Sequence, residues 1–368
     1  MHSLAEAAVK RGEDVIILSV GDPDFATPEP IVDSAVAALR SGDTHYTSMG
    51  GRQELRAAIA ELAARRTGVS YGIDNAVVTA GTQNALFASS LCLAGHGDEI
   101  IALEPMYLTY TSTLSVGGAS LKLVGQSAPD FRPDVDKIAQ VITDKTRVIA
   151  LTNPNNPTGV VLNPNELEGI AELARDNDLW VISDEVYCDV VFGEGFTSIA
   201  SVPGMDERTV IVGSLSKSHA MTGWRIGWAV GPQALIEHIE ALQVIVNYGV
   251  PGFVQEAALD AIEKYHGTAV EMRAVYQRRR DLAAKILSEV DNIDVLVPDA
   301  GMYLLLDVSR VAESSVDFCH QLFESKRVSL LDASAFGASA QGWVRLSFTV
   351  SDDRLREGCE RIVDFISK

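Results

Sequence analysis

One lysine of this sequence has neighbours suited to covalent chemistry with a carbonyl compound. Lys217 follows the apolar run 210–212 and stands between Ser216 and Ser218. An amine whose pKa the surroundings can lower is the side chain that proteins use to form a Schiff base. Arg225, eight positions further on, and the nearby hydroxyls are donors suited to phosphate oxygens. The run therefore predicts a reactive lysine beside an anion site.

The simpler interpretation of a lone Ser-x-Lys is a surface lysine in a serine-rich loop. Here the lysine is followed by Gly-Trp-Arg-Ile-Gly at residues 223–227. This tail adds glycines and a fixed cation, and it favours the functional interpretation over the surface one.

The candidate residues follow apolar segments that alternate with helical patterns at 82–93 and 166–177. Such alternation is typical of an α/β fold with a mostly parallel sheet covered by helices on both faces. Ligands of these sheets bind outside the carboxyl ends of the strands. Loops are polar in general, but that does not explain why each polar residue has a type suited to one ligand. The expected strands are 76–79, 99–103, 147–151, 180–183 and 210–212, and the residues after them are Thr82, Tyr107, Asn156, Asp184 and Lys217.

The remainder of the chain predicts a second, smaller α+β unit. Residues 271–290 form a long charged helical pattern that contains Arg278, Arg279 and Arg280. We expect these arginines on a solvated helix face or at an interdomain contact rather than at a phosphate site. The shorter strands expected after this helix are 293–297, 303–308, 328–331 and 344–348, and a short helical segment is expected at 4–11, before the apolar run 15–18.

Composition excludes several classes of function. The 368 residues carry a formal net charge of −20, which argues against nucleic acid or an anionic membrane surface as a partner. The four cysteines have no CxxC spacing, so we expect free thiols and no metal site. Neither a signal peptide nor a membrane-spanning run is evident, so a cytoplasmic protein is expected. The cysteines are Cys92, Cys188, Cys319 and Cys359.

Several separated motifs, in order, resemble those of the class I/II aminotransferases, enzymes of fold type I that use pyridoxal 5′-phosphate. The resemblance covers nearly the whole chain. The motifs are Gly-Asp-Pro-Asp-Phe at 21–25, His-Tyr at 45–46, Ala-Gly-Thr-Gln-Asn-Ala at 80–85, Asn-Pro-Asn-Asn-Pro-Thr-Gly at 153–159, Ser-Asp-Glu-Val-Tyr at 183–187, the Lys217 run, and Trp-Val-Arg-Leu-Ser at 343–347.

The resemblance implies a fold and an activity. A large domain at 41–270 is expected to bind the cofactor, and a small discontinuous domain to comprise 1–40 and 271–368. The implied reaction moves an amino group from an L-amino acid to a 2-oxo acid by a ping-pong mechanism. A β-lyase or a decarboxylase on the same fold is the alternative reaction. A non-enzymatic binding module, such as the aminotransferase-like sensor domain of a transcription regulator, would need an appended basic helix-turn-helix, which the sequence lacks.

The resemblance also implies a role for each matching residue. Lys217 would form the Schiff base and move a proton, and Asp184 would keep the ring nitrogen protonated, although an aspartate here could simply cap the next turn. Tyr107 would stack on the ring, or it simply packs beside Pro105. Tyr46 would reach the cofactor phosphate of a neighbouring subunit, which implies a homodimer with shared sites. The other implied contacts are Tyr187 and Asn156 with the phenolic oxygen, Gly81, Thr82, Gln83, Ser214, Ser216 and Arg225 with the phosphate, and Gly21, Asn156 and Arg345 with the substrate.

One departure from the family pattern concerns the substrate. Many bacterial aspartate aminotransferases have a lysine at the position of Gln83, where it helps to bind the second carboxylate of the substrate. Without this lysine, a preference for aspartate is not expected. The wider pattern resembles the arginine–pyruvate transaminases of the family, so arginine and pyruvate are the first expectation, and an aspartate or aromatic aminotransferase is the alternative.

Overall fold

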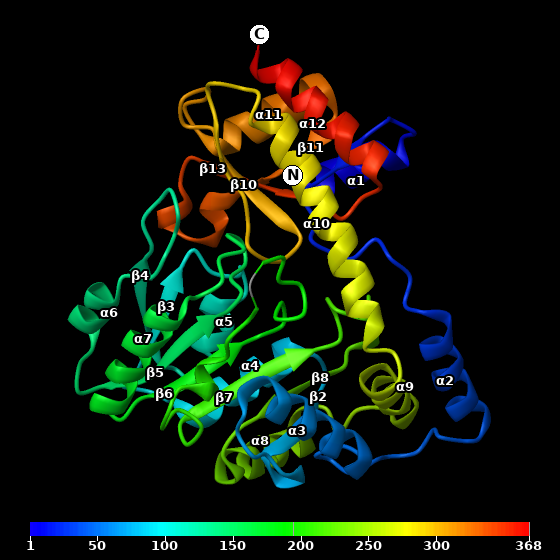
Figure 1. Ribbon diagram of the computed structural model, residues 1–368, viewed down its shortest axis with the longest axis vertical. Helices are drawn as coiled ribbons and strands as arrows, with labels where there is room; N and C mark the ends of the chain where they lie inside the picture. Colours follow the sequence, from blue (N-terminus) through cyan, green and yellow to red (C-terminus); the bar gives the residue numbers. More distant parts are fainter. Residues whose placement is uncertain (194, 368) are drawn as a thin grey trace.

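The computed structural model describes residues 1–193 and 195–367. Figure 1 shows a large sheet with its helices in the lower half and a smaller assembly of strands and helices at the top. The long helix α10 (Gly267–Leu287) runs between the two halves. No helix in the described ranges has both the length and the apolar character needed to cross a membrane.

The large sheet has seven strands in the order β2-β8-β7-β6-β5-β3-β4. All neighbouring strands run parallel except β8, which is antiparallel to both β2 and β7. The five strands predicted from the sequence are present, and the mostly parallel α/β fold is confirmed. The strands are β2 (Ala76–Thr79), β3 (Glu99–Glu104), β4 (Ser120–Gly125), β5 (Thr146–Thr152), β6 (Trp180–Asp184), β7 (Thr209–Ser214) and β8 (Gly227–Val230).

The central strands of this sheet are largely apolar because both of their faces are buried. Within β3, Ile100 and Ala102 pack in one core cluster, and Ile101 and Leu103 pack in another. The first cluster includes residues of α4 (Thr82–Leu93) and α8 (Gln233–Val246), and the second includes residues of α7 (Pro164–Asp176). Alternate residues of one strand thus hold helices on opposite faces.

Edge strand β4 was not predicted from the sequence, and the reason is physical. Most of its residues are exposed or half-buried, so it lacks the continuous apolar run that marks the central strands. Strand β8 was not predicted either. It is only four residues long and continues directly from the Lys217 run, so the sequence pattern does not separate it from that motif.

The smaller assembly contains a four-stranded antiparallel sheet and a parallel two-stranded sheet. The first has the order β12-β13-β10-β9, and the second pairs β1 with β11. The single strand expected at 328–331 is instead two short strands, which separate at the buried Leu330 and join different sheets. The strands are β1 (Ile16–Ile17), β9 (Asp294–Leu296), β10 (Tyr303–Asp307), β11 (Val328–Ser329), β12 (Leu331–Asp332) and β13 (Trp343–Ser347).

The helices of both assemblies pack on these sheets. The predicted helices at 82–93, 166–177 and 271–290 correspond to α4, α7 and α10. The others are α1 (His2–Lys10), α2 (Glu29–Arg40), α3 (Gln53–Thr67), α5 (Tyr110–Leu114), α6 (Val135–Val141), α9 (Gly252–Glu263), α11 (Ser315–Lys326) and α12 (Asp352–Ile366).

Helix α2 differs from the proposed division at residue 40. The prediction assigns it to the small domain, but its buried Ile31 and Ala35 belong to a cluster with residues of α3 and α9. Figure 1 shows α2 beside α9 at the lower right. Residues 29–40 therefore pack with the large sheet, and the rest of the domain division remains a proposal.

The three arginines of α10 have different surroundings. Arg279 is 6% exposed and forms ion pairs with Asp24 at 2.7 Å and with Asp352 at 3.0 Å. Arg278 shares the carboxylate of Asp352, but its own side chain is largely exposed. The buried Arg279 fixes the segment that contains Gly21 to α10 and α12. Arg280 donates to the backbone oxygen of Pro298 at 3.1 Å and lies over the ring of Phe192, so two of the three make structural contacts rather than lying on a solvated face.

Candidate active site

The predicted residues meet at one edge of the large sheet. Asp184 is the last residue of β6 and Ser214 the last of β7. Because β2, β3, β5, β6 and β7 run in one direction, their carboxyl ends lie along the same edge. The turns that follow these strands carry Gly81, Tyr107, Asn156 and Lys217. The sheet topology thus places the chemistry where α/β folds bind ligands.

The amine of Lys217 lies inside this edge and contacts the opposite assembly. Its Nζ donates a hydrogen bond to the backbone oxygen of Gly21 at 3.0 Å. Burial, with smaller contributions from the charges of Arg345 and Arg225 and against the effect of Asp22, lowers the pKa of Lys217 from 10.5 to about 8. A large fraction of this amine is therefore neutral near pH 8, as a nucleophile or base must be.

Asp184 is a buried carboxylate that no cation neutralises. It is 5% exposed and forms no ion pair within the described residues. Its oxygens accept hydrogen bonds from the hydroxyl of Tyr110 and from the backbone N–H of Val186. Burial raises the pKa of Asp184 from 3.8 to about 6, although both hydrogen bonds oppose this. Such a group favours a ligand that brings a positive charge.

Tyr187 and Asn156 lie close to one another. Asn156 Nδ2 lies 3.5 Å from the hydroxyl of Tyr187, and both residues are 5% exposed. Burial raises the pKa of Tyr187 to about 12, so its hydroxyl remains a hydrogen-bond donor at neutral pH. Tyr107 is 38% exposed and packs edge-on against Tyr110. Its ring therefore keeps an open face at the strand ends.

Arg345 is held rigidly on β13. Its guanidinium stacks between the rings of Tyr303 and Phe336, with its central carbon 4.9 Å from each ring centre. It donates hydrogen bonds to Asn156 Oδ1 at 3.0 Å and to the backbone oxygen of Ser19 at 3.2 Å. Its Nε has no partner within the described residues. An anchored guanidinium with an unused donor suits a carboxylate ligand.

Glycines bring three chain segments together at the start of α4. Gly81 has φ +84°, and a Cβ there would lie 2.4 Å from Nη2 of Arg225. A Cβ on Gly227 would lie 2.6 Å from the carbonyl carbon of Gly81 and 2.7 Å from the amide nitrogen of Thr82. Because Gly81 and Gly227 lack side chains, the first turn of α4 can lie this close to the guanidinium of Arg225 and to the start of β8.

The same place offers hydrogen-bond donors without acceptors. Thr82 Oγ1 is buried and has no partner in the described part of the chain. The first amides of a helix lack partners within the helix, and the helix dipole favours an anion there. The hydroxyls of Ser214 and Ser216 are buried at the end of β7 and just after it. These donors and Arg225 form a cradle for a dianion.

Gln83 contributes differently from the others. Its side-chain oxygen accepts from Thr109 Oγ1 at 3.0 Å, and its side-chain nitrogen donates to Thr113 Oγ1. Both groups of the amide are thus engaged with the segment of α5. The second N–H of the side-chain nitrogen and the backbone amide of Gln83 are left for an anion, and neither carries a charge.

Tyr46 is the predicted residue that the fold does not bring to this cluster. It is 81% exposed and packs against Tyr248 with ring centres 4.7 Å apart. Both rings line a surface groove of about 600 Å³ formed by residues 43–47 and 247–253. Within one chain, Tyr46 therefore points into an open groove.

Four residues at the site were not identified from the sequence. Tyr110 and Thr152 lie behind Asp184, and Tyr303 and Phe336 enclose Arg345. Tyr110 could have been found as the residue one helical turn after Tyr107. Tyr303 lies on β10 and Phe336 at the end of a short 3-10 helix before β13, so only the fold reveals that both rings enclose Arg345.

Comparisons with known proteins agree with this geometry. Residues 13–362 match the family model described as aminotransferase class I and II. The arginine–pyruvate transaminase of Pseudomonas aeruginosa is 44% identical over 363 residues, 98% of this chain and 92% of that protein. The aspartate aminotransferase of Thermotoga maritima is 35% identical over 368 residues, 100% of this chain and 95% of that protein. The structure of Thermus thermophilus aspartate aminotransferase with maleate superimposes with a TM-score of 0.94 at 32% identity, covering 99% of this chain and 94% of that one.

The lowered pKa of Lys217 can be measured in the protein without ligands. We expect competitive acetylation as a function of pH, followed by peptide mass spectrometry, to give Lys217 a midpoint near its pKa of about 8. The other lysines of the same sample are the internal control. Asp22→Asn should shift the midpoint of Lys217 down and Arg225→Met should shift it up, following the sign of each charge. A midpoint above about 10, the ordinary range of lysine, would contradict the burial of this amine.

Proposed function

The chain belongs to the class I and II aminotransferases, and we propose that it uses pyridoxal 5′-phosphate to move an amino group from an L-amino acid to a 2-oxo acid. The observation that carries the proposal is the position of three unlike groups at one sheet edge. A carboxylate without a cation, an amine of lowered pKa and an anion cradle lie along the strand ends. Each of them matches one group of this cofactor: the carboxylate its basic ring nitrogen, the amine its aldehyde, and the cradle its phosphate.

The types of these residues match the groups that the cofactor presents. Asp184 would hold the ring nitrogen, and this pairing would supply the cation that its buried carboxylate lacks. Thr82, with its unpartnered hydroxyl, and Arg225 would hold the phosphate. Tyr107 would cover one ring face. The remaining phosphate contacts would be Gly81, Gln83, Ser214 and Ser216, and the contacts to the phenolic oxygen would be Tyr187 and Asn156.

The bound cofactor would supply an electron sink for the electrons left when a proton leaves Cα of the substrate. Lys217 would take that proton as a general base and return it later as a general acid, since a pKa of about 8 serves both directions. Arg345 would bind the α-carboxylate, assisted by Asn156 and by the backbone of Gly21. Two such half-reactions, with donor and then acceptor, make a ping-pong cycle.

For the amino donor we propose arginine or another long side chain, with pyruvate as acceptor. Gln83 offers no cation to a second carboxylate, and both ends of its amide are engaged with Thr109 and Thr113. Asp22, whose charge acts on Lys217, is exposed beside the site and would favour a cationic side chain. The relative from Pseudomonas aeruginosa is named for arginine and pyruvate, while the Thermotoga maritima relative is named for aspartate.

We further propose a homodimer in which Tyr46 completes the site of the partner subunit. An apolar strip at the end of α8 supports this, because soluble monomers rarely expose large contiguous apolar areas. The strip adjoins the groove that Tyr46 lines. Its members are Val244, Ile245, Val246 and Tyr248, exposed by 43%, 82%, 46% and 52%.

A single half-reaction tests the proposed function. The enzyme loaded with pyridoxal phosphate is incubated with one amino acid and no acceptor, and the released 2-oxo acid and ammonia are measured. We expect about one equivalent of 2-oxo acid per site and no ammonia, because the amino group stays on the enzyme until an acceptor removes it. Continued turnover with release of ammonia would indicate a lyase instead.

The same assay ranks donors when it is run with arginine, alanine, phenylalanine and aspartate. Arginine should react fastest and aspartate slowest, since a missing charge partner in a desolvated pocket commonly costs on the order of 2–5 kcal/mol. If aspartate were the fastest donor, the specificity inferred from Gln83 would be wrong. Lys217→Ala is the inactive control for every donor.

Subunit mixing tests the shared sites. Lys217→Ala and Tyr46→Ala chains are expected to be nearly inactive alone, and a mixture should recover about a quarter of the wild-type activity. Random exchange makes half of the dimers hybrids, and each hybrid has one site with both residues intact. Recovery must be absent when two Lys217→Ala preparations with different tags are mixed. If mass spectrometry shows exchange but activity stays absent, the sites are not shared through Tyr46.

A further inference from the structure

Tyr110 fixes the carboxylate of Asp184 from behind. Tyr110 begins α5 and is only 2% exposed. Its hydroxyl donates to Asp184 Oδ2, and the backbone N–H of Val186 donates to Oδ1 at 3.0 Å. With a donor on each oxygen, the carboxylate plane cannot turn. Neither donor carries a charge, so these hydrogen bonds orient the carboxylate of Asp184 without neutralising it.

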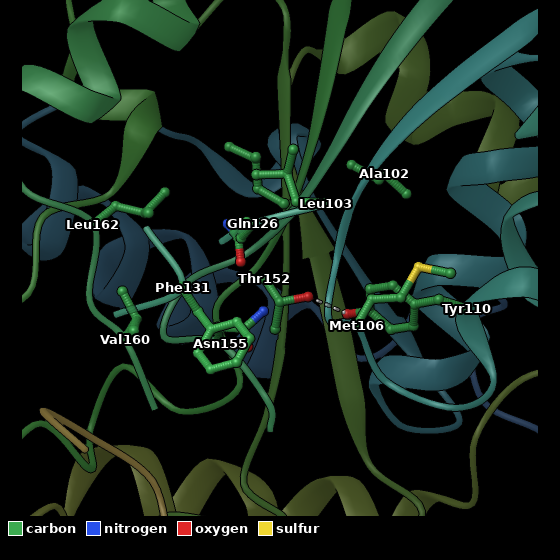
Figure 2. A pocket seen from close by; sticks show the side chains of 12 residues that line it. Ala102, Leu103, Met106, Tyr110, Gln126, Phe131, Thr152, Asn155, Val160 and Leu162 are labelled. Atoms are coloured by element: carbon green, nitrogen blue, oxygen red, sulfur yellow. Dashed lines mark hydrogen bonds between the residues drawn. The ribbon is translucent and has the colours of Figure 1, made fainter. Parts of the chain in front are cut away.

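A second hydroxyl extends this contact. Thr152 Oγ1 donates to the hydroxyl oxygen of Tyr110 at 3.0 Å. Figure 2 shows the two side chains pointing toward one another at the edge of a small cavity, joined by this bond. Thr152 is the last residue of β5 and lies opposite Asp184 in the β5–β6 register. Neighbouring strands thus hold both ends of the chain Thr152–Tyr110–Asp184.

The direction of these hydrogen bonds depends on the charge of Asp184. A tyrosine hydroxyl has one hydrogen, and an ionised carboxylate can only accept. When the hydrogen of Tyr110 points to Asp184, its oxygen is free to accept the hydrogen of Thr152, as the structure shows. If the facing oxygen of Asp184 were protonated, both hydroxyl hydrogens would have to reverse. The observed arrangement is therefore the one that stabilises the charged aspartate.

We propose that Tyr110, supported by Thr152, is the positioning residue that holds Asp184 in the orientation and charge state in which it meets the ring nitrogen of the cofactor. This inference rests on the proposed function. Tyr110 acts through Asp184 and has no contact of its own with the ligand in this role. It explains how an aspartate so deeply buried remains available as an anion.

The other groups around Asp184 do not replace this contact. Burial raises the pKa of Tyr110 well above its ordinary value, so it remains a donor throughout the useful pH range. Glu185 is bound instead by Ser183 and Ser198, and burial raises its pKa to about 7. The remaining titratable neighbours within electrostatic reach of Asp184 are Tyr187, Cys188 and Tyr303.

These contacts determine how the affinity for the cofactor depends on pH. Protonation of Asp184 at low pH removes the charge that attracts the ring nitrogen, so cofactor affinity falls on the acid side. The hydrogen bond from Tyr110 lowers the pKa of Asp184. Removing that hydroxyl raises the pKa, and the acid limb of the binding profile moves to higher pH.

The test measures the dissociation constant of pyridoxal phosphate from pH 5 to 9 by equilibrium dialysis against the apoprotein. Tyr110→Phe should move the acid limb up by about one pH unit, the size expected for one hydrogen bond to a charged group. Thr152→Val should move it in the same direction by less. Titrations of the cofactor itself are common to all variants and cancel in the comparison.

Tyr71→Phe is the matched control, because the hydroxyl of Tyr71 is buried without a partner among the described residues. Its profile should coincide with that of the wild type. In an Asp184→Asn background, Tyr110→Phe should cause no further shift, because the group it acts through no longer titrates. An unshifted acid limb in Tyr110→Phe would overturn the proposal. If that variant fails to fold, an unshifted limb in Thr152→Val does so.

Failure of this inference is distinguishable from failure of the proposed function. If Asp184→Asn itself leaves cofactor binding and its pH profile unchanged, the role of Asp184 is wrong, and the proposed function loses its main support. If Asp184→Asn weakens binding strongly while Tyr110→Phe changes nothing, only the positioning role of Tyr110 is wrong.

Discussion

The site depends on one carboxylate that the fold buries without a cation. Asp184 lies at the end of a central strand, where the sheet excludes water and raises its pKa to about 6. A buried charge is costly unless it is paired. The apoprotein limits this cost with two hydrogen bonds but does not remove it. A ligand that carries a positive ring nitrogen would complete the pair, which supports the cofactor proposed for this site.

The basic side chains of the site, Lys217 and Arg345, have surroundings that differ from those of Asp184. Arg345 is also buried and Lys217 is partly buried, and desolvation lowers the pKa of both. Two aromatic faces, the side-chain oxygen of Asn156 and the backbone oxygen of Ser19 hold the guanidinium of Arg345. Among the described residues, the amine of Lys217 is hydrogen-bonded only to the oxygen of Gly21. The guanidinium therefore stays charged as a fixed anchor. The amine can lose its proton near neutral pH, which separates a binding cation from a reactive one.

Much of this arrangement could be predicted from the sequence. Continuous apolar runs identified the central strands, and their order placed Asp184 and Lys217 at one edge. The edge strand β4 was missed because its residues are half exposed, and α2 was misplaced because its packing on α9 depends on contacts distant in sequence. Tyr110 and Thr152 were missed for a related reason. Each looks like an ordinary loop or strand residue until the fold brings its hydroxyl to Asp184.

The central claim is tested most directly by the stability of Asp184→Asn with and without pyridoxal phosphate at pH 8, where the buried aspartate is ionised. A raised carboxyl pKa means that the folded protein loses stability as the pH rises from about 4 through 6. The amide avoids this loss and can be accommodated, since Tyr110 can accept from its NH₂ group and donate to Thr152.

Denaturant unfolding of the apoprotein should therefore show the variant to be at least as stable as the wild type. The increase in stability on adding the cofactor should be large for the wild type and much smaller for the variant. A variant that is less stable as apoprotein, yet is stabilised by the cofactor as strongly as the wild type, would contradict the account.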